Sequence, residues 1–234
     1  MCKFRLAIAD WCVPVSGPDV CRMAAEAGLD GVELNLGEFE HNLPLTDPHV
    51  RRYYLDAQQR YGVDFCGIAV NALDKSFVMP PENPQRAAGY FREACDEAEK
   101  HGIIVSSENP MSVEDNLALC DLVDRPNFRL YFDNENPVYF NGANSAEMLR
   151  ALGSRVCQIH VKDGTDAQMS SCHLGQGHAY FHECVQVIHE IGYTGWIVSE
   201  NNYDMPPFNT FENDRFELLV EDVRIMKQAF LQQP

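Results

Sequence analysis

Short apolar runs alternate with longer amphipathic stretches along the chain. The short runs are rich in Val, Ile and Leu and lead into polar residues, which is typical of buried parallel strands. Most of the longer stretches stop at a glycine, the residue preferred just after the end of a helix. The pattern predicts strands at Leu6–Trp11, Gly31–Leu36, Asp64–Val70, Ile103–Glu108, Arg129–Asp133, Val156–Val161 and Trp196–Glu200. It predicts helices at Pro18–Ala27, His49–Tyr61, Pro84–His101, Val113–Val123, Ser145–Leu152, Tyr180–Ile191 and Asp214–Phe230.

This alternation of strands and helices leaves two architectures, a closed (β/α) barrel and an open doubly wound sheet. No G-x-G-x-x-G turn follows the first strand and no P-loop is present, which weakens the nucleotide-binding open sheet. We therefore expect an α/β fold of the TIM type, a (β/α) barrel. No low-complexity linker or charge block divides residues 1–234, so a single domain is the simplest organisation.

The charge of the chain limits its partners. The 35 acidic residues outnumber the 18 basic ones and give a formal net charge of −17, which argues against nucleic acid or an anionic membrane as a partner. The nine cysteines are scattered without a C-x-x-C pair, as expected of reduced thiols. No apolar run is long enough for a membrane span or a secretory signal. We expect a cytoplasmic protein without a membrane partner.

Four of the predicted strand ends in the second half of the chain bear groups that bind divalent cations. They are Glu108 in VSSENP, Asp133 in YFDNENP, His160 in IHVKDG and Glu200 in IVSEN. Three carboxylates and one imidazole suit a hard or borderline metal ion. Taken singly, each acid could cap the next helix and the histidine could lie in the core. In a barrel, however, all four would converge on the face that bears active sites.

The stretches VSSENP, YFDNENPVYFNG, VCQIHVKDG, LGQGHAYF and IHEIGYTGWIVSEN resemble the second half of the xylose-isomerase-like TIM-barrel superfamily, the group of sugar phosphate isomerases and epimerases and of AP endonuclease family 2. The first 100 residues resemble it more loosely, through AAEAGLDGVEL. The resemblance implies that Glu108, Asp133, His160 and Glu200 bind one divalent ion, Mn, Mg, Co or Zn. It further implies that Glu108 and Glu200 are the acid and the base on opposite faces of a small sugar-like substrate.

Such chemistry is physically reasonable. A proton next to a carbonyl is too weakly acidic for a carboxylate to remove unaided, so a cation must hold the charge of the enediolate. One glutamate then takes the proton and a carboxyl group returns it. Return to the opposite face epimerises the substrate, and return to the neighbouring carbon isomerises it. We therefore expect a metal-dependent isomerase or epimerase of a sugar, a sugar phosphate or a hydroxy-keto acid.

Two positions depart from the epimerase members of the group. Asn136 stands where those proteins have a histidine, and Asp166 stands where they have an arginine. Asn136 can still donate a hydrogen bond to a sugar oxygen. Lys162 could hold a substrate hydroxyl, carboxylate or phosphate, or it could form a salt bridge with Asp163 at the barrel rim.

Polar and aromatic residues in the first half of the chain would lie at the same end of the barrel as the four candidate ligands. Trp11 could form an apolar wall against the C–H face of a sugar, and Asn71 could bind substrate. Glu33 could orient a metal ligand or cap a helix.

The chain has one βα unit fewer than the eight of this superfamily, because Pro84–His101 leads directly into IIVSSEN. Apart from a short piece near Ser76–Met79, no segment is left for an eighth strand. A ring of seven strands must close with a different shear, stay open or borrow a strand from a neighbouring subunit, and a homo-oligomer is therefore possible.

Two other functions compete with the enzyme hypothesis. A shortened barrel could keep its metal ligands and serve as a non-catalytic metal- or sugar-binding module. An apurinic endonuclease would need several more histidines than these strand ends provide, and the acidic charge opposes it.

Overall fold

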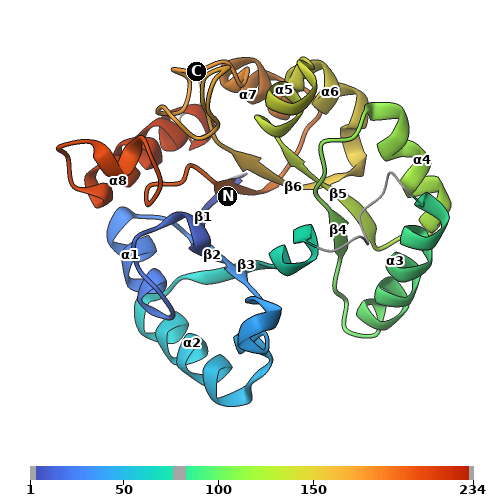
Figure 1. Ribbon diagram of the computed structural model, residues 1–234, viewed down its shortest axis with the longest axis horizontal. Coiled ribbons are helices and arrows are strands. Elements are labelled where there is room, and N and C mark those ends of the chain that lie inside the picture. The colour runs from blue at the N-terminus through green and yellow to red at the C-terminus, as the bar shows by residue number, and fades with distance from the viewer. Residues whose placement is uncertain (1–3, 76–82, 232–234) are drawn as a thin grey trace.

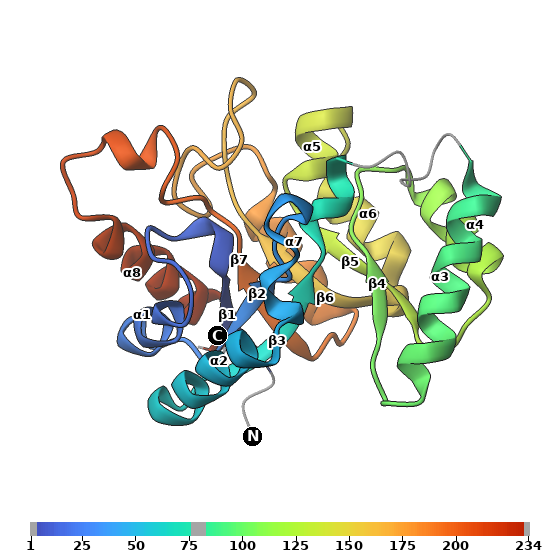
Figure 2. The same ribbon diagram turned by 60° about the horizontal axis from the view of Figure 1, so that its bottom comes forward.

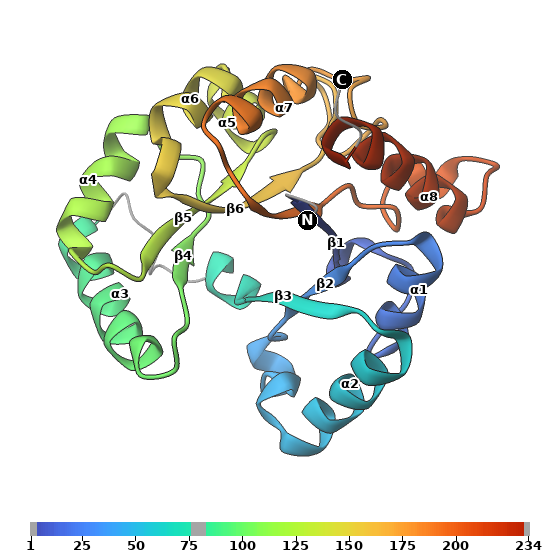
Figure 3. The same cartoon turned by 180° about the vertical axis from the view of Figure 1, so that it is seen from behind.

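The computed structural model describes residues 4–75 and 83–231. Seven parallel strands form one curled sheet in the order β3-β2-β1-β7-β6-β5-β4, with helices on its outer side (Figures 1 and 3). This arrangement is the expected TIM-type barrel, one βα unit short. The strands are β1 (Phe4–Ala9), β2 (Gly31–Asn35), β3 (Asp64–Ala69), β4 (Val105–Ser107), β5 (Phe128–Asp133), β6 (Val156–Val161) and β7 (Gly195–Ser199).

The helices alternate with the strands, as the pattern predicts. They are α1 (Asp19–Ala27), α2 (Pro48–Tyr61), α3 (Pro84–Glu99), α4 (Val113–Val123), α5 (Asn136–Asn141), α6 (Ser145–Leu152), α7 (Phe181–Glu190) and α8 (Arg215–Met226). Side chains of Asp47, Asn83, Ser112 and Asn144 cap the N-termini of α2, α3, α4 and α6 by accepting a backbone hydrogen bond. Gly28 and Gly62 follow α1 and α2 with positive φ, which glycine adopts without steric cost.

The sheet is open between β3 and β4, the two strands at its ends. Among the described residues, β3 pairs only with β2 and β4 pairs only with β5, and the two strands face each other across the open side (Figure 1). Ile68 of β3 is 59% exposed, and Ile103 and Ile104 before β4 are each 55% exposed. Apolar side chains at these places fit a barrel from which one covering unit is missing. The piece near Ser76–Met79 lies outside the described residues.

Some element bounds differ from the predicted ones for physical reasons. The strand predicted at Ile103–Glu108 shortens to β4, because only residues 105–107 find a partner in β5. The strand predicted to end at Trp11 ends at Ala9, and Asp10–Cys12 form the 3₁₀ turn η1. The short helix α5 was not predicted.

The core fills the barrel and the space between sheet and helices. Its fully buried side chains include Leu6, Ile8, Ile159 and Ile197 from the strands and Leu149, Ile188 and Leu219 from the helices. No helix in the described part of the chain combines the length and apolarity needed to cross a membrane. The eight cysteines at described positions are free thiols. The predicted cytoplasmic location stays a prediction.

Candidate metal centre

The strand register places the four predicted ligands side by side. Asp133 at the end of β5 pairs with His160 of β6, and Ser199 at the end of β7 pairs with Val161. Glu200 follows, and its N–H continues the ladder by donating to the Val161 carbonyl at 2.9 Å. Glu108 directly follows β4. The carboxyl ends of these strands lie on the side of the sheet where η4 (Asn71–Lys75), α5 and the loop after β6 rise (Figure 2).

Glu108, Asp133, His160 and Glu200 each offer one ligand atom, and these atoms all lie within 4.8 Å of one another. The His160 Nδ1 atom is 3.1 Å from Oε2 of Glu108 and 3.4 Å from Oε2 of Glu200. All four side chains converge, as the strand-end rule requires.

Two atoms of this cluster test whether the residues fit a cation. Among the described residues, Asp133 Oδ2 and His160 Nδ1 are buried without a hydrogen bond of acceptable geometry. The other Asp133 oxygen, Oδ1, accepts from the backbone N–H of Glu135 and Asn136, which fixes Oδ2 toward the cluster. A buried polar atom without a well-formed hydrogen bond is costly. A divalent cation would satisfy both atoms, because Oδ2 otherwise has only the ion pair with Lys162 Nζ and Nδ1 lies against carboxylates. The donor set therefore fits the predicted ion.

Lys162 lies inside this cluster. Its Nζ is 2.6 Å from Oε2 of Glu200 and 3.1 Å from Oδ2 of Asp133. Burial alone would lower the pKa of Lys162, but the charges of Asp133 and Glu200 raise it well above its ordinary value. The alternative of a rim salt bridge with Asp163 is wrong, because Asp163 turns to the backbone instead.

The Asp163 carboxylate organises the loop after β6. It accepts hydrogen bonds from the backbone N–H groups of Gly164, Gly175, Gly177 and Ala179. These bonds hold the loop of residues 164–179 in place, and Gly175 and Gly177 bring its backbone N–H groups to the carboxylate.

The two candidate catalytic glutamates have different environments. Burial raises the pKa of Glu108, and its Oε1 accepts a hydrogen bond from Asn136 Nδ2 at 2.9 Å. Burial would also raise the pKa of Glu200, but the charges of His160 and Lys162 lower it to about 2. The side chain of Glu108 is 28% exposed and that of Glu200 is 14% exposed, so Glu108 is the more accessible of the two.

Trp11, Asn136 and Asn71 were predicted to bind substrate. The indole Nε1 of Trp11 donates to Glu200 Oε1 at 3.0 Å, and Asn136 donates to Glu108, so both hold glutamates of the cluster. The Trp11 ring lies edge-on to His160 with 6.1 Å between ring centroids. Asn71 begins η4 directly after β3, and its role stays a prediction.

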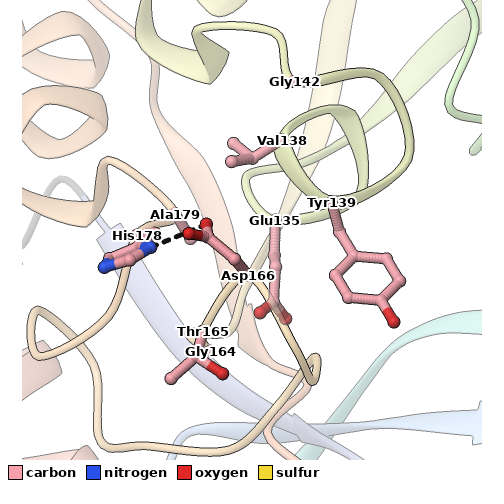
Figure 4. Close-up of a pocket in the computed structure, with 9 residues that line it drawn as sticks. All are labelled: Glu135, Val138, Tyr139, Gly142, Gly164, Thr165, Asp166, His178 and Ala179. Atoms are coloured by element: carbon pink, nitrogen blue, oxygen red, sulfur yellow. Dashed lines mark hydrogen bonds and ion pairs between the residues drawn. The ribbon is translucent and has the colours of Figure 1, made fainter.

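A cavity of about 170 Å³ lies between α5 and the loop after β6 (Figure 4). It is lined by Glu135, Val138, Tyr139, Gly142, Gly164, Thr165, Asp166, His178 and Ala179. Burial raises the pKa of Glu135 to about 7. His178 is paired with Asp166 at 2.8 Å. Glu135 and Tyr139 were not among the predicted site residues, although Glu135 stands two positions after a ligand.

Residues 73–229 match the family model of the xylose isomerase-like TIM barrel. The chain belongs to this family. This confirms the resemblance noted in the sequence, and the match includes the segments that supply all four ligands.

Relatives in the family include epimerases. A 2-epi-5-epi-valiolone 7-phosphate 2-epimerase from Actinoplanes sp. is 26% identical over 210 residues, which are 74% of this chain and 77% of that protein. The D-allulose 3-epimerase from Methylomonas sp. superposes with a TM-score of 0.75 at 17% identity, covering 98% of this chain and 99% of that one. A xylose isomerase domain protein from Planctomyces limnophilus gives 0.72 at 15% identity, covering 98% of both chains. At these identities the solved structures support the fold.

Proposed function

We propose that this chain is a divalent-cation-dependent isomerase or epimerase of a sugar-like substrate. The observation that carries the proposal is the convergence of Glu108, Asp133, His160 and Glu200, with two buried ligand atoms that lack hydrogen bonds among the described residues. The similarity to a sugar phosphate epimerase supports the same reaction class.

The reaction would be a proton transfer between two carboxyl groups. A bound divalent cation would supply electrostatic stabilisation of the negative charge that develops on the substrate oxygens. One of Glu108 and Glu200, as the carboxylate, takes the proton from the carbon next to the carbonyl, which leaves an enediolate. The other, as the acid, gives a proton to the opposite face of that carbon or to the neighbouring carbon. In the second case the hydroxyl proton also passes from one substrate oxygen to the other, so that the carbonyl group changes place. The proton count is unchanged, and the two roles exchange in the reverse direction.

The remaining groups would position these two side chains. Trp11 and Lys162 hold the two oxygens of Glu200, and Asn136 holds one oxygen of Glu108. Lys162 is also close enough to the cluster to contact a substrate oxygen. Asn71, which follows β3, would bind the substrate at the same end of the barrel.

The cavity between α5 and the loop after β6 would receive the rest of the substrate, since its lining residues Glu135 and Gly164 stand two and four positions after Asp133 and His160. Its lining offers hydroxyl and carboxylate groups and contains no Lys or Arg side chain. Such a surface suits sugar hydroxyl groups better than a phosphate dianion. This favours a free sugar among the substrates considered.

The test is solvent deuterium exchange. The chain loaded with Mn²⁺ is incubated in D₂O with a panel of ketoses and their phosphates, and deuterium next to the carbonyl is measured by NMR. We expect incorporation with a free ketose and a loss of at least roughly 10³-fold in Glu108→Gln and Glu200→Gln, because each removes a proton-transfer group. Glu114→Gln, at an exposed position in α4, is the matched control. Full exchange by both site variants would refute the assignment.

The open edge between β3 and β4 supports a second candidate function, a binding barrel without turnover. That function predicts Mn²⁺ and sugar binding in calorimetry with no deuterium incorporation from any ketose. The same D₂O experiment separates the two candidates.

A further inference from the structure

A chain of polar side chains crosses the interior of the barrel next to the candidate metal centre. Gln158 Nε2 donates to the Tyr131 hydroxyl at 3.0 Å, and this hydroxyl donates to Glu33 Oε2 at 2.7 Å. The same Glu33 oxygen lies 2.8 Å from His160 Nε2. Glu33 is 3% exposed and His160 is 1% exposed, so these hydrogen bonds lie away from water, where such bonds are strong.

These contacts join the two ends of the open sheet. Glu33 belongs to β2, next to the end strand β3, whereas Tyr131 belongs to β5, next to the end strand β4 (Figure 1). Among the described residues β3 and β4 do not pair, so backbone ladders connect these two sides only the long way round, through β1, β7 and β6. The hydrogen bond between Tyr131 and Glu33 therefore spans the barrel where the backbone does not close it.

Close packing leaves Glu33 little freedom to move. A Cβ atom added at Gly67 of β3 would lie 3.0 Å from Glu33 Oε1. The Tyr131 ring lies over the His160 ring with 4.2 Å between centroids. Carboxylate, phenol and imidazole are thus held in one arrangement.

The arrangement determines which nitrogen of His160 faces the cluster. A histidine that binds a cation is neutral and keeps one proton. Nδ1 faces the cluster and Nε2 faces Glu33, so the proton of a cation-bound His160 is on Nε2, where Glu33 Oε2 can accept it. The lone pair of a neutral imidazole is then on Nδ1, the atom 3.1 Å from Glu108 Oε2. A second carboxylate behind a histidine ligand commonly orients the ring and increases its basicity.

We propose that Glu33 and Tyr131 are positioning residues that fix the tautomer and orientation of His160 for cation binding, and that they do so from the opposite side of the open barrel. This inference rests on the proposed function only in needing a cation at the cluster. It assigns the glutamate of GVELNL and the tyrosine of RLYFD a role at the open side of the barrel, where β3 and β4 do not pair among the described residues.

The test is Mn²⁺ affinity by isothermal titration calorimetry, with no substrate present. We expect Glu33→Gln to weaken Mn²⁺ binding roughly 10–100-fold, since loss of an outer-shell partner has this typical effect. Tyr131→Phe removes one hydroxyl and should weaken binding roughly 3–10-fold. Tyr193→Phe is the matched control, because Tyr193 is also buried and its hydroxyl donates to the carbonyls of Cys157 and Trp196, away from the cluster.

A second readout follows the ligand itself. With Co²⁺ in place of Mn²⁺, the visible absorption spectrum reports the ligand field, and Glu33→Gln should shift it while Tyr193→Phe leaves it unchanged. Should Glu33→Gln fail to fold, Tyr131→Phe compared with Tyr193→Phe decides the question.

The outcomes separate the two proposals. Wild-type affinity and spectrum in both Glu33→Gln and Tyr131→Phe would overturn this inference and leave the proposed function standing. Equal loss in Tyr193→Phe would also overturn it, since the effect would then be general destabilisation. Failure of the wild-type chain to bind Mn²⁺ or Co²⁺ would overturn both.

Discussion

The indole N–H of Trp11 donates to Oε1 of Glu200 at 3.0 Å, while Lys162 Nζ holds the other oxygen at 2.6 Å. Two donors on a carboxylate fix both its position and its rotation. Trp11 therefore connects the turn after β1 to the end of β7, and it sets the geometry of a candidate catalytic group.

Trp11→Phe tests this contact. The variant keeps an aromatic ring but loses the N–H donor, and a hydrogen bond to a charged group contributes about 1.5–3 kcal/mol. We expect kcat to fall about tenfold or more, measured by steady-state kinetics with the substrate that the D₂O panel identifies. Trp196→Phe is the control, because Trp196 stacks under Arg5 instead, 4.0 Å from the guanidinium carbon, and should keep wild-type kcat. Equal losses in the two variants would contradict a specific role for Trp11.

Asp133→Asn tests the cation site through stability. A ligand that binds only the folded state stabilises it by about 2.7 kcal/mol at 100 times its dissociation constant. Wild-type protein with saturating Mn²⁺ should therefore show a higher Tm, and EDTA should reverse the increase. Asp133→Asn should lose most of this shift, whereas Asp121→Asn at an exposed position should keep it. A full shift in Asp133→Asn would exclude Asp133 as a ligand.

Asp10 should make the stability of the fold depend on pH. Burial, with a smaller contribution from the charge of Glu33, raises the pKa of Asp10 from 3.8 to about 7. Between these pH values the folded chain keeps a proton that the unfolded chain has lost. Stability should therefore fall as pH rises from about 4 to about 7, by at most about 1.4 kcal/mol per pH unit from this group.

Asp10→Asn should remove that part of the pH dependence. Its amide oxygen can still accept from the Asn35 N–H, which Asp10 Oδ1 does at 3.0 Å. We expect the variant to be more stable than wild type at pH 8 and similar near pH 4, measured by urea unfolding at each pH. Asp19→Asn, at an exposed position, should follow the wild-type curve. Parallel curves for wild type and Asp10→Asn would show that Asp10 does not titrate in this range.

Asp163→Ala should loosen the loop over the site. The change leaves four backbone N–H groups without their acceptor, at a cost on the order of 3 kcal/mol. Limited proteolysis should cut residues 164–179 faster than in wild type. Asp166→Ala, whose side chain is 84% exposed, should show little change in unfolding free energy. Unchanged proteolysis of Asp163→Ala would contradict the anchoring role.

The close approach of the four candidate ligands could be predicted from the sequence, because all four stand at strand ends. The carboxyl ends of parallel strands meet at one edge, so Asp133 and His160 had to be neighbours once their strands were recognised. Their close approach follows from strand pairing, which a short apolar run already encodes.

Contacts that depend on side-chain direction could not be predicted in the same way. Lys162 follows β6 and has Asp163 as its sequence neighbour, yet it turns to Asp133 and Glu200. The difference depends on the backbone amides of a loop that reaches Asp163 from residues 175–179. Sequence spacing contains no information about such a long-range contact.

The sequence pattern also did not predict where β4, the strand at one end of the sheet, begins. Ile103 and Ile104 have the composition of a buried strand, but in the described part of the chain they pair with no neighbouring strand and they are exposed. Apolar composition indicates that a segment favours a buried strand, but the strand forms only where a neighbouring strand is present to pair with it.

The position of the break in the sheet explains why the residues of the candidate metal centre stay together. All four ligands lie on the uninterrupted arc β4-β5-β6-β7, and the deleted unit would have stood outside this arc, between β3 and β4. A gain or loss of one strand and helix between β3 and β4 thus changes the number of strands in the barrel and leaves the candidate ligands next to one another. Because α3 packs against α4 and β4, a helix and strand added to fill the opening would enter the chain between η4 and α3.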